Sequence, residues 1–150
     1  MTEVGFYHLT RSSLDEALPR LLEKAYAAGH RMVVRGGDAE RIELLNRTLW
    51  TYGKDSFLPH GARSDGFAED QPIYLTAQVE NPNGATILVR VDDAEAPDLD
   101  TFDRCLDLFD GSDPDAVARA RARWREAREA GHACTYWQQG ERGGWVKAGG

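Results

Sequence analysis

The sequence predicts an α/β domain with parallel strands, and three observations support this fold class. Apolar runs alternate with amphipathic runs in the order strand, helix, strand, helix over residues 3–49, which is typical of βαβ units. The 150 residues are 41% hydrophobic and 29% charged, an ordinary balance for a globular protein. A chain of this length buries roughly two thirds of its unfolded surface without disulfides. We therefore expect one domain over residues 1–150, with residues 140–150 as a frayed, glycine-rich tail.

The first half of the chain contains two strand–helix pairs. EVGFYHL (residues 3–9) is a β-prone aromatic run, and the leucines after it repeat at helical spacing. This helix is expected to begin at Ser12 or Ser13 and to end at Gly29. HRMVV then indicates a buried strand, the RGGD turn follows it, and Asp38 is expected to cap a second helix.

The middle of the chain combines a loop with two strands. Residues 61–71 are loop-like, whereas residues 72–77 and 85–91 are rich in β-branched and apolar side chains. Asn83-Gly84 lies between these two runs and is a reversal signal of the kind found in hairpins.

The last third of the chain predicts strand, helix, strand. Residues 102–110, FDRCLDLFD, suit either a helix or a strand, and Gly111 directly after them favours a strand. A long helix is expected over residues 113–130 with Ser112 as its N-cap, followed by a strand over residues 132–139.

No catalytic, metal or cofactor site is predicted. RGGD lacks both GxGxxG and GxxxxGK[ST], so its glycines are explained by a tight turn. Cys105 and Cys134 lack CxxC spacing and fit reduced thiols, and Asp92-Asp93 indicates a solvated acidic loop. The histidines are far apart, without HxxxH or HExxH spacing: His8, His30, His60 and His132.

Charge and hydropathy limit the possible partners. The net charge of −7 and the pI of about 5.1 argue against direct nucleic-acid binding. No stretch approaches 18 consecutive apolar residues, and the N-terminus lacks a signal-peptide pattern. A cytoplasmic protein that does not contact membranes is therefore expected.

The most informative segment is the arginine-rich helix over residues 113–130. At about 100° per residue, Arg121, Arg125 and Arg128 fall within roughly 60° of arc, flanked on the apolar side by Trp124 and Val117. Three guanidinium groups beside an indole favour a short acidic ligand with an apolar end.

A structural explanation of the same helix stays open. Late arginines and early aspartates suit the helix dipole, and Trp124 can serve as a core anchor. Arg119 and Arg123 point the opposite way, beside Glu126, and are expected only to solvate the back of the helix.

Several segments together resemble one protein family. The segments are FYHL, LWTYGKDSFLPHG, LDLFDG, RARWREAREAGH and TYWQQ. In this order they resemble the chi subunit of bacterial DNA polymerase III holoenzyme, over about residues 5–147. The tryptophan followed by SFLPH is the most specific part. The resemblance implies a single three-layer Rossmann-like domain with a mixed, largely parallel sheet and helices on both faces.

The resemblance also implies a function and a first partner site. Chi proteins are non-catalytic accessory subunits of the clamp-loader assembly and bind the acidic, phenylalanine-ending C-terminal tail of single-stranded DNA-binding protein. By position, this site falls on Arg121, Trp124 and Arg125, with Trp50 nearby. Some chi proteins carry a basic residue where this chain has Val117, and we expect Arg128 to supply the missing charge.

A second partner site is implied by residues 49–61, whose aromatic and apolar side chains are unusual in a polar stretch. Phe57 matches the aromatic residue that chi presents to the psi subunit or to a helicase, and Leu58, Pro59 and His60 would shape that surface. A clamp-loader component is the expected partner where psi is absent. The alternative is that the segment folds back as a core plug.

Two further functions remain as alternatives. The RGGD turn could belong to a small nucleotide-binding or hydrolytic α/β enzyme. Trp50 and Trp124 could bind single-stranded DNA directly by stacking on its bases, although the net acidity disfavours this.

Overall fold

The computed structural model describes residues 2–10, 12–52, 59–62, 65–139 and 144–149. The helices are α1 (Leu14–Ala27), α2 (Ala39–Thr51) and α3 (Pro114–Glu129). The strands are β1 (Glu3–Leu9), β2 (Met32–Arg35), β3 (His60–Ala62), β4 (Ile73–Thr76), β5 (Ile87–Arg90), β6 (Arg104–Asp110), β7 (Ala133–Gln139) and β8 (Trp145–Gly149). Short 3-10 helices occupy Ala68–Asp70 and Leu99–Thr101.

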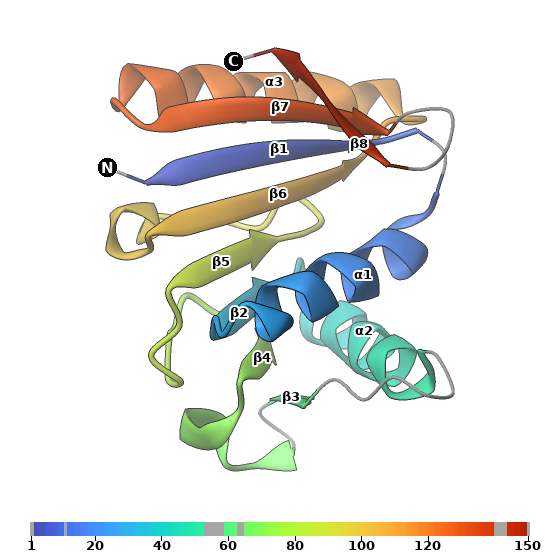
Figure 1. The fold of residues 1–150 in the computed structure, drawn as a ribbon, viewed down its shortest axis with the longest axis vertical. Coiled ribbons are helices and arrows are strands. Elements are labelled where there is room, and N and C mark those ends of the chain that lie inside the picture. Colours follow the sequence, from blue (N-terminus) through green and yellow to red (C-terminus); the bar gives the residue numbers. More distant parts are fainter. Residues whose placement is uncertain (1, 11, 53–58, 63–64, 140–143, 150) are drawn as a thin grey trace.

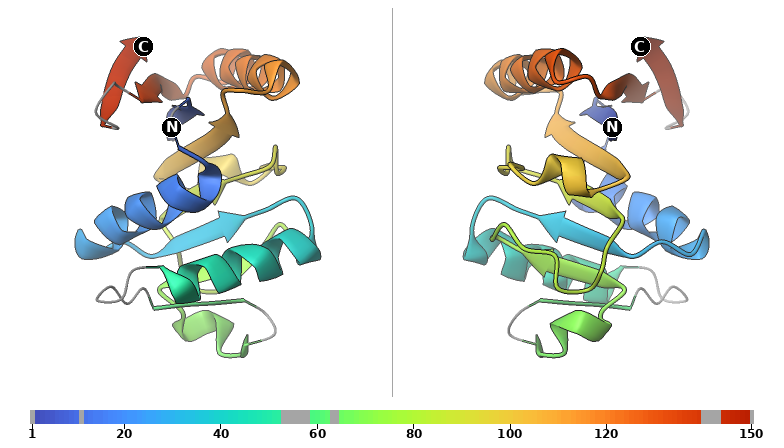
Figure 2. Two further views of the ribbon diagram at one scale, coloured as in Figure 1. Left: turned by 90° about the vertical axis from the view of Figure 1, so that its right-hand side faces the viewer. Right: turned by 90° about the vertical axis from the view of Figure 1, so that its left-hand side faces the viewer.

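These strands form one sheet in the order β3-β4-β2-β5-β6-β1-β7-β8. Among the described strands, neighbours are parallel except for β7 and β8, which are antiparallel. α1 and α2 cover one face of the sheet and α3 covers the other (Figures 1 and 2). This three-layer arrangement confirms the predicted α/β fold with a mixed, largely parallel sheet.

The core has one apolar cluster on each face of the sheet. Val34 of β2 packs with Leu22 of α1 and Leu45 of α2, whereas its neighbour Val33 belongs to the cluster beneath α3. Both valines are 0% exposed. Parallel strands covered on both faces consist of continuous apolar residues rather than alternating ones, which is why HRMVV lacks polar alternation. None of the described helices is long and apolar enough to cross a membrane.

The helix starts agree with the sequence at α1 and α2 and differ at α3. Ser13 is the N-cap residue of α1, and the Asp38 carboxylate accepts the Arg41 backbone N–H at 2.8 Å at the start of α2. At α3 the N-cap is Asp113 rather than the predicted Ser112. The Ser112 hydroxyl instead donates to the Asp110 carboxylate at 2.6 Å, so it does not cap the helix.

The reversal signal at Asn83-Gly84 marks a turn but not a hairpin. The chain does turn there, with a φ of 66° at Gly84, but β4 and β5 do not pair with each other. Both pair in parallel with β2, which lies between them. The Asn83 amide donates to the carbonyls of Met32 (3.1 Å) and Gln71 (2.8 Å) and so fixes the crossing segment to the start of β2.

Two edge strands were not expected from the sequence. β3 lies within a segment predicted to start a loop, because three residues that include a glycine give no periodic pattern. β8 corrects the prediction of a frayed tail for residues 145–149, since it pairs with β7 and Trp145 packs edge-on against Tyr7, with ring centroids 5.0 Å apart. Residues 140–143 and 150 lie outside the described residues.

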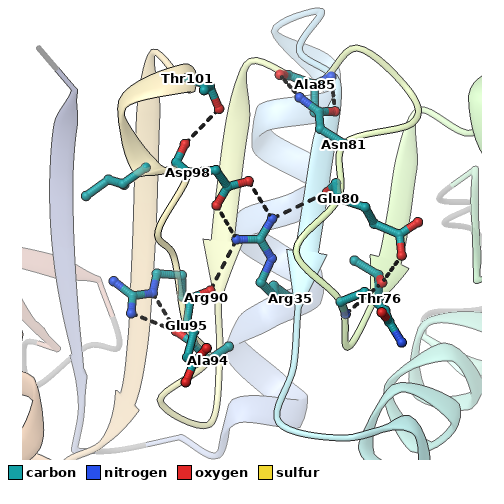
Figure 3. A network of polar contacts seen from close by, with 12 residues as sticks. Arg35, Thr76, Glu80, Asn81, Ala85, Arg90, Ala94, Glu95, Asp98 and Thr101 are labelled. Atoms are coloured by element: carbon teal, nitrogen blue, oxygen red, sulfur yellow. Dashed lines mark hydrogen bonds and ion pairs between the residues drawn. The ribbon is translucent and has the colours of Figure 1, made fainter.

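On the face of the sheet that α3 covers, a buried arginine connects the segments that lie beyond the reach of this helix. Arg35, at the end of β2, is 1% exposed and donates to both carboxylate oxygens of Asp98, at 2.7 and 3.0 Å (Figure 3). It also donates to the carbonyls of Glu95 (3.2 Å) and Glu80 (3.3 Å). Arg35 therefore joins the segments after β4 and β5 to β2, which lies between those two strands.

Candidate functional site

The arginines of α3 divide into two sets, and both members of the first set pair with aspartates of the domain. Arg123 donates from Nε and Nη2 to the two carboxylate oxygens of Asp107, at 2.7 and 2.9 Å. Asp93 accepts from Arg119 at 2.8 Å and also from Arg123. The prediction that Arg119 and Arg123 only solvate the helix is therefore wrong, because β6 directs the 1% exposed Asp107 side chain at α3.

Burial and charge act against each other at these carboxylates. Burial raises the pKa of Asp107 above the usual aspartate value, although the hydrogen bond from Arg123 opposes this. Burial also acts to raise the pKa of Asp93, but Arg119 and Arg123 outweigh it and hold that pKa below the usual value. Asp93 is thus an internal counterion rather than part of a solvated loop. Arg119 and Arg123 already pair with aspartates of the domain, so they are not available to a ligand.

The second set of arginines faces outward, as predicted. Arg121, Arg125 and Arg128 are all exposed, and within the part of the chain that the structure describes neither Arg121 nor Arg125 forms a salt bridge. The Arg128 guanidinium lies over the Trp124 ring, 5.7 Å from its centroid. Two guanidinium groups on this side of α3 are consequently available to an acidic ligand.

Trp124 combines the two roles considered for it. Its half-buried indole packs edge-on against Phe6 of β1 (centroids 5.4 Å apart, 64°) and Tyr136 of β7 (6.0 Å, 76°). These contacts make it part of the apolar cluster beneath α3, as a core anchor would be. The remaining surface of the indole is accessible beside the outward arginines.

Tyr136 belongs to the same surface, although the sequence did not single it out. Its ring is half-buried, and burial raises its pKa while the nearby Arg121 charge opposes the rise. Alternation along β7 could have predicted this position, because Cys134 and Tyr136 share the face that α3 covers. We refer to Arg121, Trp124, Arg125, Arg128 and Tyr136 as the α3–β7 surface.

Trp50 is not part of the α3–β7 surface, which corrects the expectation that it lies nearby. It is at the end of α2, which packs on β3 and β4, whereas α3 packs on β1, β6 and β7 across the other face (Figure 1). The Trp50 and His60 rings lie 4.7 Å apart. Trp50 therefore belongs with the second predicted partner site.

The second partner site is described only in part. Phe57 and Leu58 lie outside the described residues, Pro59 is half-buried, and His60 is 6% exposed within β3. Trp50 covers His60 and is 57% exposed. His60 therefore supports this surface from below, and among the described residues of this site Trp50 presents an exposed aromatic side chain.

The RGGD turn carries negative charge where a phosphate-binding turn needs backbone donors. It follows β2 at the carboxyl ends of the parallel strands, which is where open α/β folds bind ligands. The Asp38 carboxylate occupies the N-terminus of α2, and the Asp92 carboxylate lies against Gly37 and pairs with Arg41 at 2.9 Å. A phosphate would meet two carboxylates here, which disfavours the nucleotide-binding alternative.

A cavity of about 660 Å³ also lies at the carboxyl ends of the strands, where β1 and β6 end. Its charged lining consists of four carboxylates and two arginines: Asp92, Asp93, Asp110, Asp113, Arg41 and Arg119. Both arginines are paired with aspartates of the lining. Among the described residues no group of three or more His, Cys, Asp or Glu side chains is placed to hold a metal ion.

Comparison with known proteins agrees with the resemblance seen in the sequence. The family described as "DNA polymerase III chi subunit, HolC" matches residues 1–135. A probable DNA polymerase III subunit chi from Rickettsia prowazekii is 38% identical over 89 residues, which span 59% of this chain and 54% of that protein. A DNA polymerase III subunit chi from Pseudomonas aeruginosa is 29% identical over 137 residues, 88% of this chain and 93% of that protein. Because the family match covers nearly all of the sequence, this chain belongs to the chi subunit family of DNA polymerase III, a family of accessory subunits in DNA replication.

Proposed function

We propose that this protein is an adaptor in the replicative polymerase assembly, and that its α3–β7 surface binds the acidic, phenylalanine-ending C-terminal tail of single-stranded DNA-binding protein. The supporting observation is the contrast within α3. Arg119 and Arg123 are held by aspartates, whereas Arg121 and Arg125 are exposed and, within the described residues, form no salt bridge.

The chemistry of this surface fits such a tail. Tail carboxylates bind the Arg121 and Arg125 guanidinium groups through charge-assisted hydrogen bonds, each worth about 1.5–3 kcal/mol. The terminal phenylalanine packs on the Trp124 and Tyr136 rings, and burial of such a side chain contributes about 1.5–3 kcal/mol. Together these terms approach the roughly 8 kcal/mol of a micromolar complex, before the entropic cost of association. The interaction is a reversible tether.

The adaptor needs a second contact that links the tail site to the clamp loader. We assign it to the segment containing Phe57, Leu58, Pro59 and His60, together with Trp50, which packs on His60. The partner is the psi subunit or another clamp-loader component, with a helicase as a competing partner. The exposed Trp50 indole supports this placement, because large exposed aromatic side chains are enriched where proteins bind each other.

The tail site is tested by Arg121→Ala and Arg125→Ala. Each substitution is expected to weaken binding about 10- to 100-fold, because it removes one charge-assisted contact. Fluorescence anisotropy with a labelled acidic peptide ending in phenylalanine measures this directly. Rising salt should also weaken wild-type binding, since exposed charges are screened.

The matched control is Arg119→Ala, which removes the same charge from the same helix. The Arg119 side chain is 52% exposed and pairs with Asp93, so its loss should leave the tail affinity within about threefold of wild type. If Arg119→Ala weakened binding as much as Arg121→Ala, general charge rather than this surface would explain the interaction.

The second contact is tested by Phe57→Ala. We expect the tail affinity to stay unchanged while co-purification with the clamp-loader partner is lost. The measurement is a pull-down of clamp-loader subunits, run in parallel with the peptide titration. A loss of thermal stability in this variant would instead support the core-plug interpretation of the segment.

A further inference from the structure

His8 is a titratable side chain to which the proposed function gives no role. It lies near the end of β1, and its Nδ1 is 2.5 Å from the Tyr136 hydroxyl oxygen. Its ring packs against Phe109 (centroids 5.1 Å apart, 37°) and against Tyr136 (5.8 Å, 86°). The imidazole is thus held by β6 on one side and β7 on the other.

Gly111 closes a third side of the imidazole. A Cβ atom at this position would lie 2.1 Å from His8 Cδ2 and 2.5 Å from the Leu9 carbonyl oxygen, closer than atoms can approach. Only glycine leaves room for the imidazole here. The position of the His8 ring is therefore fixed by the backbone after β6 as well as by its aromatic neighbours.

Tyr136 transmits this constraint to the α3–β7 surface. Its ring lies between Phe109 (6.1 Å) and Trp124 (6.0 Å), and the Arg121 charge acts on its hydroxyl. Because Tyr136 is only half-buried, packing alone constrains it less than a core residue. The hydrogen bond to His8 is the specific contact that fixes its hydroxyl end.

We infer that His8 is a positioning residue of the α3–β7 surface: it fixes Tyr136, and Tyr136 in turn fixes the Trp124 indole beside Arg121. This inference rests on the proposed function, since it concerns the same binding surface. A ligand gains affinity from a surface that is already ordered, because less conformational freedom is lost on binding. Removal of the hydrogen bond lets Tyr136 and Trp124 adopt other rotamers, and the ligand then has to order them.

A double-mutant cycle tests the coupling. His8→Leu and Tyr136→Phe are each expected to weaken binding of the acidic peptide about threefold to tenfold, the effect of one hydrogen bond. The double variant should be no weaker than the weaker single variant, because both changes remove the same contact. His8→Asn, whose amide reaches the position of Nδ1, should restore near wild-type affinity. Unchanged affinity in His8→Leu, or single effects that multiply in the double variant, would overturn the inference.

A second readout needs no ligand and separates this inference from the proposed function. In NMR spectra of the free protein, the Trp124 indole N–H resonance should shift in His8→Leu and Tyr136→Phe and return in His8→Asn. His30→Leu, a histidine substitution before β2, should leave it in place. A Trp124 resonance that does not move in His8→Leu refutes the positioning role even if the peptide binds. Conversely, if the wild-type protein does not bind the peptide, the tail site is refuted, while the Trp124 indole resonance still tests the role of His8.

Discussion

Arg123→Ala is expected to destabilise the protein by about 3–5 kcal/mol, the cost of leaving a buried charge without its partner. The Asp107 carboxylate is 1% exposed and receives two hydrogen bonds from Arg123. Arg90, the other guanidinium group near Asp107, is 3.9 Å away and donates to the Ala94 carbonyl, so it does not replace Arg123. A loss of this size is a large part of the roughly 5–15 kcal/mol that stabilises a typical domain.

Urea unfolding of Arg123→Ala and of Arg121→Ala measures the effect against a matched control. Both variants lose the same side chain from α3, but Arg121 is exposed and its loss should change stability by no more than about 0.5 kcal/mol. The double variant Arg123→Met/Asp107→Leu should recover most of the loss, because an apolar pair needs no counterion. Equal destabilisation by the two alanine variants would show that Asp107 is not a buried, paired charge.

The stability loss in Arg123→Ala should also depend on pH. Burial raises the pKa of Asp107 even in the wild type, and removal of Arg123 raises it further. A carboxylate whose folded pKa lies above its unfolded value destabilises the protein in its ionised form, and this penalty falls as pH falls. The difference in unfolding free energy between variant and wild type should therefore be smaller at pH 5 than at pH 8.

Arg35→Met is expected to lower the free energy of unfolding by about 3 kcal/mol, because it removes a guanidinium group that joins the segments after β4 and β5 to β2. The substitution keeps an apolar stem in the core but leaves the Asp98 carboxylate and the carbonyls of Glu80 and Glu95 without their donor (Figure 3). In a chain of this length, thermal denaturation should show a decrease in Tm of about 6–12 °C. Arg31→Met, a substitution of an exposed arginine before the same strand, is the matched control.

The same pair predicts how acid affects the wild type. The hydrogen bond from Arg35 lowers the pKa of Asp98 below the usual aspartate value, although partial burial opposes it. The resulting stabilisation is present above the usual aspartate pKa, about 3.9, and is lost as pH falls through the lower folded value. Unfolding free energies below about pH 4 should therefore decline less steeply in Arg35→Met than in wild type, and identical slopes would contradict the assignment.

Much of this fold follows from local sequence patterns. The run HRMVV, with Met32, Val33 and Val34 in succession, predicted a buried strand, and the capping role of Asp38 is determined by its immediate neighbours. The separation of Arg121 and Arg125 from Arg119 and Arg123 follows from helical geometry alone. In these cases the information lies within about one turn or one strand of the residue concerned.

The incorrect predictions concern contacts between residues far apart in the sequence. Arg123 was expected to face solvent because nothing near it shows that β6 directs Asp107 at α3. Trp50 was placed beside α3 because residue order does not reveal which face of the sheet each helix covers. The turn at Asn83 suggested a hairpin because β2, which separates the two strands, lies about 50 residues earlier.

The alternation of aspartate-paired and outward arginines along α3 has a consequence for how this protein can diverge. Folding depends on Arg123, which pairs with the buried Asp107, whereas Arg121 and Arg125 make no comparable internal contribution among the described residues. Substitutions at the outward positions can therefore retune partner affinity while the fold keeps its stability. Within this one helix, the residues that determine partner binding differ from those that determine stability. A change of partner therefore does not require a prior gain in stability.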